Sequence, residues 1–300
     1  MEHLEQHLIT AFLIAAVFLV LGGLIFNGFI ATLIIIEWAK CQRLPSIELL
    51  LLSLGMSNIF TTVFLAGYFA VVFSLITVRY LVFQILRSCF IFAASCRYTF
   101  TAWLCVFYCV KIVNSTQSLF LWWKLRISRL IPRLIVGSLI FSLSVSLTAF
   151  YSLQDQTQGT TASRVTNATQ EETLTLESLK IIIFATATGC PIVLVLLSST
   201  LVVASLYHHV CQMTGKESCL KNPQTEAHIK AAGTVASLLL LYVLFYVGHI
   251  LSLLDALRES GHIFVSIMML VYSPAQAAIL MFVNPKLKQA ASRMLLQTKH

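Results

Sequence analysis

Charged side chains are scarce in this sequence. Only 11% of its 300 residues are Asp, Glu, Lys or Arg, whereas soluble globular domains carry about 25%. Hydrophobic residues make up 58% of the chain, and the mean hydropathy is +0.86. Such a chain lacks the polar surface of a soluble domain, so we expect a protein that crosses the membrane several times.

The sequence also lacks the residue patterns of enzymes, metal sites and transporters. It has no Ser/His/Asp grouping, no glycine-rich phosphate loop, no HExxH motif and no Cys/His spacing that indicates zinc. Its acidic residues fall in loops or at interfaces, and its halves do not repeat, which argues against a transporter. We therefore predict no catalytic residue, no metal, no cofactor and no nucleic-acid partner.

Seven apolar runs are long enough to cross a bilayer, which takes about 20 residues per helix. They cover residues 8–36, 46–74, 88–112, 130–153, 178–207, 229–254 and 263–283. Loops and tails fill what remains. The sequence therefore predicts one all-α domain over residues 1–300, a seven-transmembrane helix bundle without a separate soluble domain.

Lysine and arginine are unevenly distributed between the two sides of this bundle. The loops near 37–45, 111–133 and 208–230 and the tail from 285 hold 14 of the 20. Because basic loops stay in the cytoplasm, we expect an extracellular N-terminus and a cytoplasmic C-terminus. The net charge of +8 then fits contact with anionic membrane lipid and with a cytoplasmic protein.

The stretch 99–126 predicts how one helix leaves the bilayer. It is uncharged up to Lys111, and the pair Trp122-Trp123 precedes Lys124 and Arg126. Indole rings favour the headgroup layer, and basic residues favour its cytoplasmic side. We therefore expect a basic, aromatic loop at the inner membrane surface, with the next helix beginning near residue 130.

Three polar residues lie at membrane depth. A lone amide there must hydrogen-bond to a neighbouring helix, so we interpret Asn27 as a packing residue. We expect the Arg97 side chain to snorkel outward rather than to contact a ligand. His249 lies among aromatic residues, and a histidine at that depth favours a cavity.

Two sequons test the orientation. Asn167-Ala168-Thr169 falls in the predicted outer loop and is predicted to accept a glycan. Asn114-Ser115-Thr116 has the same pattern but falls on the predicted cytoplasmic side. We therefore expect glycosylation at Asn167 and none at Asn114.

From end to end the chain resembles the type 2 taste receptors, the bitter receptors, a family of G-protein-coupled receptors. Short motifs carry the resemblance, and their order and spacing are specific only when taken together. They are Asn27-Gly28-Phe29-Ile30, Glu37-Trp38, Phe107-Tyr108, Lys111-Ile112 with Asn114, Phe120-Leu121, Lys124-x-Arg126, Ser205-Leu206 with His209 and Met213, Pro223-x-Thr225-x-Ala227-His228-Ile229-Lys230-Ala231, Leu239-Leu240-Leu241 and Asn284-x-Lys286-Leu287-Lys288. Rhodopsin-like signatures are absent, among them an Asp-Arg-Tyr at the end of the third helix.

The resemblance implies a plasma-membrane receptor that binds bitter, amphipathic small molecules and activates a heterotrimeric G protein of the gustducin/Gi class. By matching positions, the implied ligand contacts are Thr99, Trp103, Gly248, His249, Ser252, Ser266 and Met269. The implied activation switch is Phe245. The implied G-protein contacts are Lys111, Lys124, Arg126, His209 and Lys230.

The chain departs from the family pattern at three places. Asn58 replaces a common arginine, Thr99 replaces a common tryptophan, and Gln276-Ala277 replaces a common His-Ser or His-Pro. We therefore expect its ligand range and its activity without agonist to differ from those of relatives. A vomeronasal type 1-like chemosensory receptor is the nearest alternative, and a small transporter is a more distant one.

Overall fold

The computed structural model describes residues 2–72, 76–113, 118–162, 186–187, 189–205, 233, 236–247, 259–284, 287–289 and 291–292. Its long helices are α1 (Glu2–Cys41), α2 (Ser46–Val72), α3 (Tyr80–Ile112), α4 (Ser118–Ala162) and α7 (Glu259–Val283). Shorter apolar helices cover Gly189–Ser205, Ala236–Val247 and, within α7, Ser266–Phe282. Over these residues the predicted all-α class is confirmed.

Within the described residues, four helices contain stretches long and apolar enough to cross a membrane. They are Thr10–Cys41, Ser46–Val72, Tyr80–Lys111 and Leu121–Tyr151, and an 18-residue segment of the first has a mean hydropathy of 2.5. The three shorter apolar helices fall inside the last three predicted runs. The membrane class is therefore confirmed, whereas the count of seven spans stays a prediction.

The start of α4 corrects one sequence interpretation. The segment from Trp122 to Arg126 was expected to be a loop, but α4 already begins at Ser118. No glycine or proline interrupts the sequence between Ser118 and Pro132, and the Arg126 guanidinium carbon lies 4.9 Å from the centre of the Trp122 ring one turn earlier. Hydropathy marks only the apolar part of a helix and misses an extension that such pairs stabilise.

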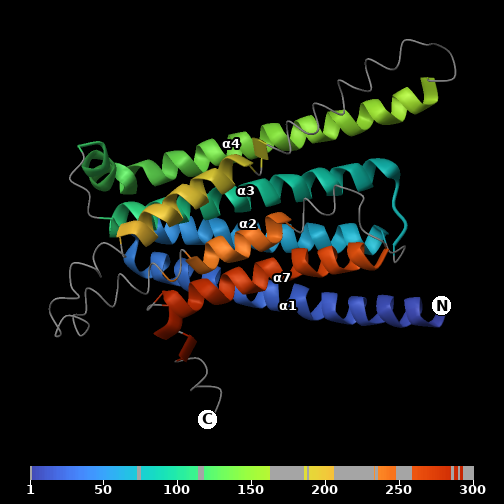
Figure 1. The fold of residues 1–300 in the computed structure, drawn as a ribbon, viewed down its shortest axis with the longest axis horizontal. Helices are drawn as coiled ribbons and strands as arrows, with labels where there is room; N and C mark the ends of the chain where they lie inside the picture. Colours follow the sequence, from blue (N-terminus) through green and yellow to red (C-terminus); the bar gives the residue numbers. More distant parts are fainter. Residues whose placement is uncertain are drawn as a thin grey trace.

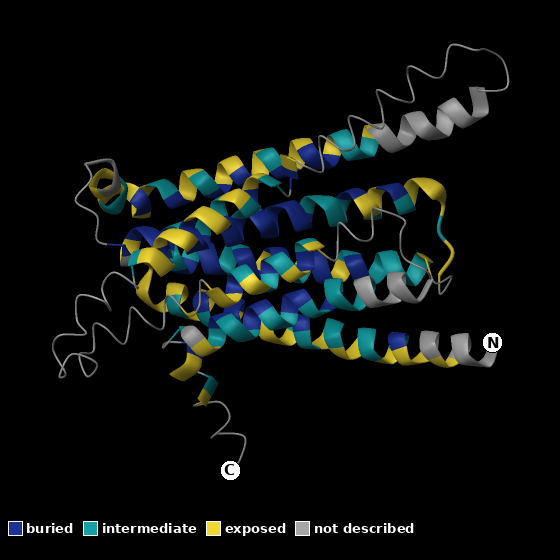
Figure 2. Cartoon of the chain, viewed as in Figure 1, coloured by how far each residue is buried: buried dark blue, intermediate teal, exposed yellow. Residues whose placement is uncertain are grey.

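Helix α3 occupies the centre of this part of the bundle. It packs against α2 and α4, while α1 packs against α2 and α7 (Figure 1). Of the 18-residue apolar segment in each helix, 67% is buried in α3 but only 17% in α1 and 22% in α4. Figure 2 shows the same contrast, with exposed residues along the outer sides of α1 and α4.

Those outer sides are apolar. Phe18 on α1 is 70% exposed and Ile140 on α4 is 65% exposed. Exposed apolar surface on this scale is unfavourable in water and suits contact with lipid chains. The surface of the bundle therefore agrees with the membrane class.

Serines set how α4 lies against α3. Trp103 Nε1 donates to Ser138 Oγ at 2.9 Å, and Ser142 Oγ donates to Ser95 Oγ at 3.1 Å. Farther along, Ser146 Oγ donates to the Ser88 carbonyl at 2.8 Å. The residue numbers of the α4 partners increase while those of the α3 partners decrease, so the two helices are antiparallel. Serine every fourth residue puts small side chains on one face, which permits close packing.

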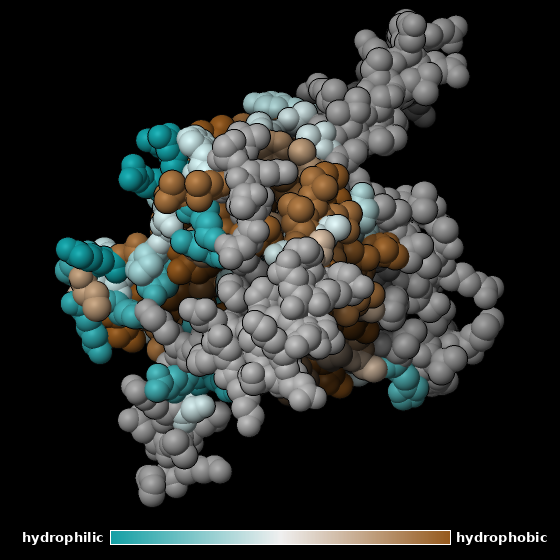
Figure 3. Space-filling view, turned by 60° about the vertical axis from the view of Figure 1, so that its left-hand side comes forward, coloured by the Kyte–Doolittle hydropathy of each residue, from teal (hydrophilic) through white to brown (hydrophobic). Residues whose placement is uncertain are grey.

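Exposed basic side chains gather at the end of the bundle where α1, α3 and α7 finish and where α2 and α4 begin. They are Lys40, Arg43, Lys111, Arg126, Arg129, Arg133 and Lys288. In Figure 3 most of the hydrophilic residues lie toward the left of the view, next to apolar ones, and the larger apolar area lies nearer the centre. Among the residues with described side chains, the exposed basic residues at the opposite end are Arg79 and Arg87.

Buried amides connect the helices at the middle of the bundle. Asn58 Nδ2 on α2 donates to Asn27 Oδ1 on α1 at 3.0 Å and to Gln276 Oε1 on α7 at 2.9 Å. Gln276 Nε2 donates in turn to Thr101 Oγ1 on α3 at 2.9 Å. All four residues are 0% exposed. We call Asn27, Asn58, Thr101 and Gln276 the amide network, and it confirms that Asn27 is a packing residue.

The amide network requires α1 to approach α7 closely. Asn27 Nδ2 also donates to the Gly23 carbonyl at 2.8 Å and to Ser273 Oγ at 3.2 Å. A Cβ atom on Gly23 would lie 3.2 Å from Ser273 Oγ and 3.4 Å from Thr62 Oγ1. Glycine therefore suits position 23, because a Cβ atom there would crowd the Ser273 and Thr62 side chains.

The pairing of Asn58 with Gln276 predicts coupled effects on stability. Asn58→Ala and Gln276→Ala should each lower the free energy of unfolding by about 1–2 kcal/mol, because each removes the hydrogen bond between the two buried amides. The loss of unfolding free energy in the double variant should be clearly smaller than the sum of the losses in the two single variants. Unfolding of the purified protein in detergent measures this, with Ser144→Ala on the exposed side of α4 as control. Additive losses would contradict the pairing.

Candidate functional site: an arginine among aromatic rings

Arg97 is buried in the bundle, with 1% of its surface exposed. Its guanidinium carbon lies 4.4 Å from the ring centre of Tyr272, 5.1 Å from that of Phe245 and 5.3 Å from that of Tyr98. The prediction that Arg97 snorkels outward is therefore wrong. The sequence indicated its depth, but not that its face of α3 turns toward α7 and the helix Ala236–Val247.

The rings around Arg97 come from three helices. The aromatic cluster consists of Tyr98 on α3, Tyr242 and Phe245 on Ala236–Val247, and Tyr272 on α7. The Phe245 and Tyr272 ring centres are 5.0 Å apart with the planes at 62°, and those of Tyr98 and Tyr242 are 5.5 Å apart at 68°. Edge-to-face geometry of this kind is the favourable one for aromatic pairs. The aromatic cluster therefore joins the three helices by direct ring contacts.

The charge of Arg97 is only partly compensated. Its Nε atom has no hydrogen-bond partner, and the side chain has no ion pair, among the residues that the structure describes. Three ring faces within 6 Å attract a cation, by about 2 kcal/mol or more at a desolvated site. Burial of a charge costs several kcal/mol, however, and a cation at membrane depth commonly marks a functional site. We therefore take Arg97 and the aromatic cluster as the candidate site.

Tyr272 joins the aromatic cluster to the amide network. Its ring lies against Arg97, and its hydroxyl oxygen accepts a hydrogen bond from Gln276 Nε2 at 3.2 Å. Thr101 Oγ1 accepts from Gln276 and donates to the Arg97 carbonyl at 2.8 Å. A displacement at Arg97 therefore has a continuous path of contacts to the middle of the bundle.

Two departures from the family pattern are in direct contact. Asn58 and Gln276 lie 218 positions apart in sequence, and they share the 2.9 Å hydrogen bond described above. Both side chains are neutral amides, and in this pair Asn58 Nδ2 donates while Gln276 Oε1 accepts. The replacement at one position is therefore matched by the replacement at the other.

The predicted ligand contacts fall into two groups. Met269 packs beside the aromatic cluster, which contains Phe245, and Ser266 lies one turn before it on α7. Thr99 Oγ1 instead bonds carbonyls of its own helix at 2.9 and 3.1 Å. Trp103 turns its indole N–H to α4. Three further contacts lie outside the described residues; they are Gly248, His249 and Ser252.

The predicted G-protein contacts that the structure describes lie at the basic end. Lys111 and Arg126 are exposed, and Lys124 is half-buried. The Lys111 ammonium lies 5.8 Å from the centre of the Phe107 ring. His209, Lys230 and the glycosylation site Asn167 lie outside the described residues.

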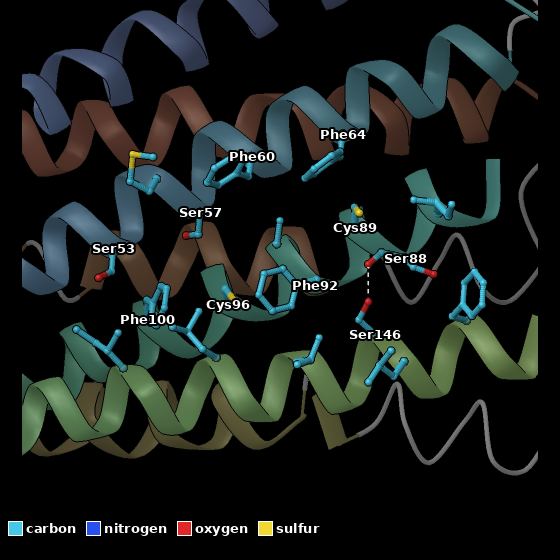
Figure 4. A pocket seen from close by; sticks show the side chains of 18 of the residues that line it. Ser53, Ser57, Phe60, Phe64, Ser88, Cys89, Phe92, Cys96, Phe100 and Ser146 are labelled. Carbon is cyan, nitrogen blue, oxygen red and sulfur yellow. Dashed lines mark hydrogen bonds between the residues drawn. The ribbon is translucent and has the colours of Figure 1, made fainter. Parts of the chain in front are cut away.

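The sequence interpretation missed two features of the described helices. Tyr98 and Tyr272 were not recognised as partners of Arg97, although a charge at membrane depth was a signal for such partners. A cavity of about 780 Å³ between α2, α3 and α4 was also missed (Figure 4). None of the predicted ligand contacts lines it.

Comparison with known proteins identifies relatives along the whole chain. The sequence profile of the family described as Taste receptor protein (TAS2R) matches residues 4–299. Taste receptor type 2 member 40 of Gallus gallus is 31% identical over 293 residues, which cover 94% of this chain and 93% of that protein. Member 2 of Homo sapiens is 27% identical over 277 residues, 91% of each chain. Member 1 of Gorilla gorilla gorilla is 29% identical over 307 residues, 99% of each chain.

The incomplete compensation of the Arg97 charge predicts that an apolar side chain is tolerated there. Arg97→Met should leave the free energy of unfolding unchanged or raise it by about 1–4 kcal/mol, because it removes a buried cation and keeps most of the volume. Arg87→Met, at an exposed arginine of the same helix, should change it by less than about 0.5 kcal/mol. Thermal unfolding in detergent measures both, and a loss of several kcal/mol in Arg97→Met would reveal an anionic partner.

Proposed function

The chain belongs to the taste receptor type 2 family of non-enzymatic G-protein-coupled receptors, and we propose that it is a plasma-membrane receptor for bitter, amphipathic small molecules. In this proposal the agonist binds between the outer halves of the helices. Binding then activates a heterotrimeric G protein of the gustducin/Gi class. One observation carries the proposal, namely that the family match extends over residues 4–299 and so includes the whole bundle.

We propose seven spans, an extracellular N-terminus and one domain over residues 1–300. Four membrane-length helices and three shorter apolar helices support the count. The exposed basic side chains at one end of the bundle support a cytoplasmic location for that end. Anionic lipid of the inner leaflet then lies beside these residues and attracts them.

The proposed agonist pocket is bounded by α3, α7 and the segment around His249. Met269 beside the aromatic cluster supports its position, and Thr99, Trp103, Gly248, Ser252 and Ser266 complete the proposed lining. With such a lining, burial of apolar agonist surface contributes about 25 cal/mol of favourable binding free energy per Å², while few hydrogen bonds form. Recognition is therefore broad, with agonists that act at micromolar or higher concentrations.

Activation in this proposal is a shift between two populations of receptor. An agonist changes the balance only if it binds the active arrangement better than the resting one. Movement of Ala236–Val247 relative to α3 would have to break the contacts of Phe245 with Arg97 and Tyr98, which supports Phe245 as the switch. The inner surface that opens would then receive the G protein at Lys111, Lys124, Arg126, His209 and Lys230.

A signalling assay tests the proposed function. We expect a dose-dependent calcium response to some members of a broad bitter panel, in cells that lack other bitter receptors and express a gustducin-containing chimeric G protein. The response should vanish without the G protein. Silence at verified surface expression would contradict the bitter-agonist proposal, and ligand-driven flux that persists without the G protein would favour a transporter.

The same assay tests the pocket residues. Trp103→Ala and His249→Ala should each raise the half-maximal agonist concentration about tenfold or more, since each removes a large contact, while surface expression is retained. Phe18→Ala is the matched control, because that ring is 70% exposed on the outer side of α1 and has no proposed contact with agonist or G protein. Unchanged dose curves would exclude Trp103 and His249 from the pocket.

Glycosylation tests the orientation. Asn167→Gln should abolish a glycosidase-sensitive mass shift, because the loop that holds the sequon is proposed to be extracellular. Asn114→Gln should leave that shift unchanged, since its sequon is proposed to be cytoplasmic. Gel mobility with and without glycosidase measures both, and a glycan at Asn114 would overturn the orientation.

A further inference from the structure

The cavity between α2, α3 and α4 has the size of a small-molecule site. Its volume is about 780 Å³, within the range of roughly 300–1,000 Å³ typical of ligand pockets. Phenylalanine rings from all three helices line it, including Phe60 on α2, Phe92 and Phe100 on α3, and Phe150 on α4 (Figure 4). The chemistry of an occupant is therefore mainly apolar.

The cavity opens toward the lipid. Phe60 on α2 is 48% exposed and Leu143 on α4 is 51% exposed, and both line it. These residues belong to helices that carry apolar outer surfaces through the membrane. An occupant therefore enters sideways from the bilayer and not from water.

The cavity is elongated along the helices. Its lining extends from Leu52 to Phe64 on α2 and from Ile135 to Phe150 on α4, which at 1.5 Å per residue are lengths of about 18 and 22 Å. The hydrocarbon layer is about 30 Å thick. The occupant therefore lies parallel to the lipid chains and spans more than half of that layer.

One hydroxyl group in the cavity lacks a partner. Ser53 and Ser57 donate to carbonyls of their own helix at 2.9 and 2.8 Å, and Ser146 donates to the Ser88 carbonyl. Ser88 Oγ, on a residue only 8% exposed, has no hydrogen-bond partner within the described part of the chain. A buried hydroxyl is unfavourable without a partner, so an occupant with one polar group at this point would be favoured.

The lining excludes a charged headgroup. None of the described residues that line the cavity is acidic, basic or histidine, so a phosphate or carboxylate beside them would be buried without a counter-ion. A neutral lipid with a single hydroxyl group and a rigid apolar body satisfies both Ser88 and the phenylalanine rings. We propose that the cavity binds a membrane sterol whose hydroxyl group hydrogen-bonds to Ser88 Oγ.

The depth of Ser88 agrees with this orientation. Helix α3 has 33 residues, a length of about 50 Å that exceeds the hydrocarbon layer by roughly 10 Å at each end. Ser88 lies eight residues after Tyr80, where α3 begins, or about 12 Å along the axis. Its hydroxyl group is therefore close to the membrane boundary, where a sterol keeps its own hydroxyl.

Photolabelling tests the site. The full-length protein, reconstituted in phosphatidylcholine nanodiscs, is irradiated with a diazirine analogue of cholesterol, and the labelled peptides are identified by mass spectrometry. We expect saturable labelling of α2, α3 or α4 at the cavity that unlabelled cholesterol suppresses. Leu143→Trp, which fills the mouth, should reduce it at least fivefold. Ile140→Trp, at an exposed position of α4 outside the cavity, should leave it unchanged.

The hydroxyl contact is tested separately. Ser88→Ala should weaken competition by cholesterol about two- to tenfold, the value of one hydrogen bond, whereas Ser144→Ala should have no effect. The sterol proposal is overturned by labelling that does not saturate, that maps elsewhere, or that Leu143→Trp and Ser88→Ala leave intact. It is also overturned if a diazirine fatty acid labels the cavity and cholesterol does not compete. The assay contains neither agonist nor G protein, so its failure would leave the receptor function untouched.

Discussion

The absence of water from the membrane interior is the constraint on which this structure depends. An amide group there has no solvent to bond with, so it must find its partners within the protein. The NH2 group of Asn58 meets this need by donating to Asn27 on one side and to Gln276 on the other. Each bond fixes the depth and the rotation of a helix relative to α2. The amide network therefore determines how α1, α2, α3 and α7 align, and apolar packing fills the space around it.

The sequence predicted the features that depend on local composition, and it missed those that depend on helix rotation. Apolar runs located the helices, and a lone amide indicated that Asn27 needs a partner. Hydropathy does not tell which face of α3 holds Arg97, so a buried side chain was expected to snorkel. Asn58 and Gln276 were noticed as two separate departures, because nothing in one sequence links positions 218 residues apart. The cavity was missed for the same reason, since it exists only between three helices.

Arg97 shows how far this bundle departs from the most stable arrangement. Ring faces attract its charge, but no anion pairs with it among the described residues. A protein selected for stability alone would place an apolar residue there. The cation instead holds Phe245 and Tyr272, from two other helices, within about 5 Å. A contact that is favourable yet weakly compensated suits a switch, because the free energy needed to separate the helices stays small.

Helix α3 presents two different faces to two different sites. Ser88, Phe92 and Cys96 line the cavity at helical spacing, while Ala94 and Tyr98 belong to the group of buried residues around the aromatic cluster. A lipid against the first face and an agonist near the second would both act on the position of one helix. If the lipid favours one arrangement of α3, linkage requires that it change agonist affinity, and that the agonist change lipid affinity by the same factor. The composition of the membrane would then set the sensitivity of the receptor through α3, without any contact between the two ligands.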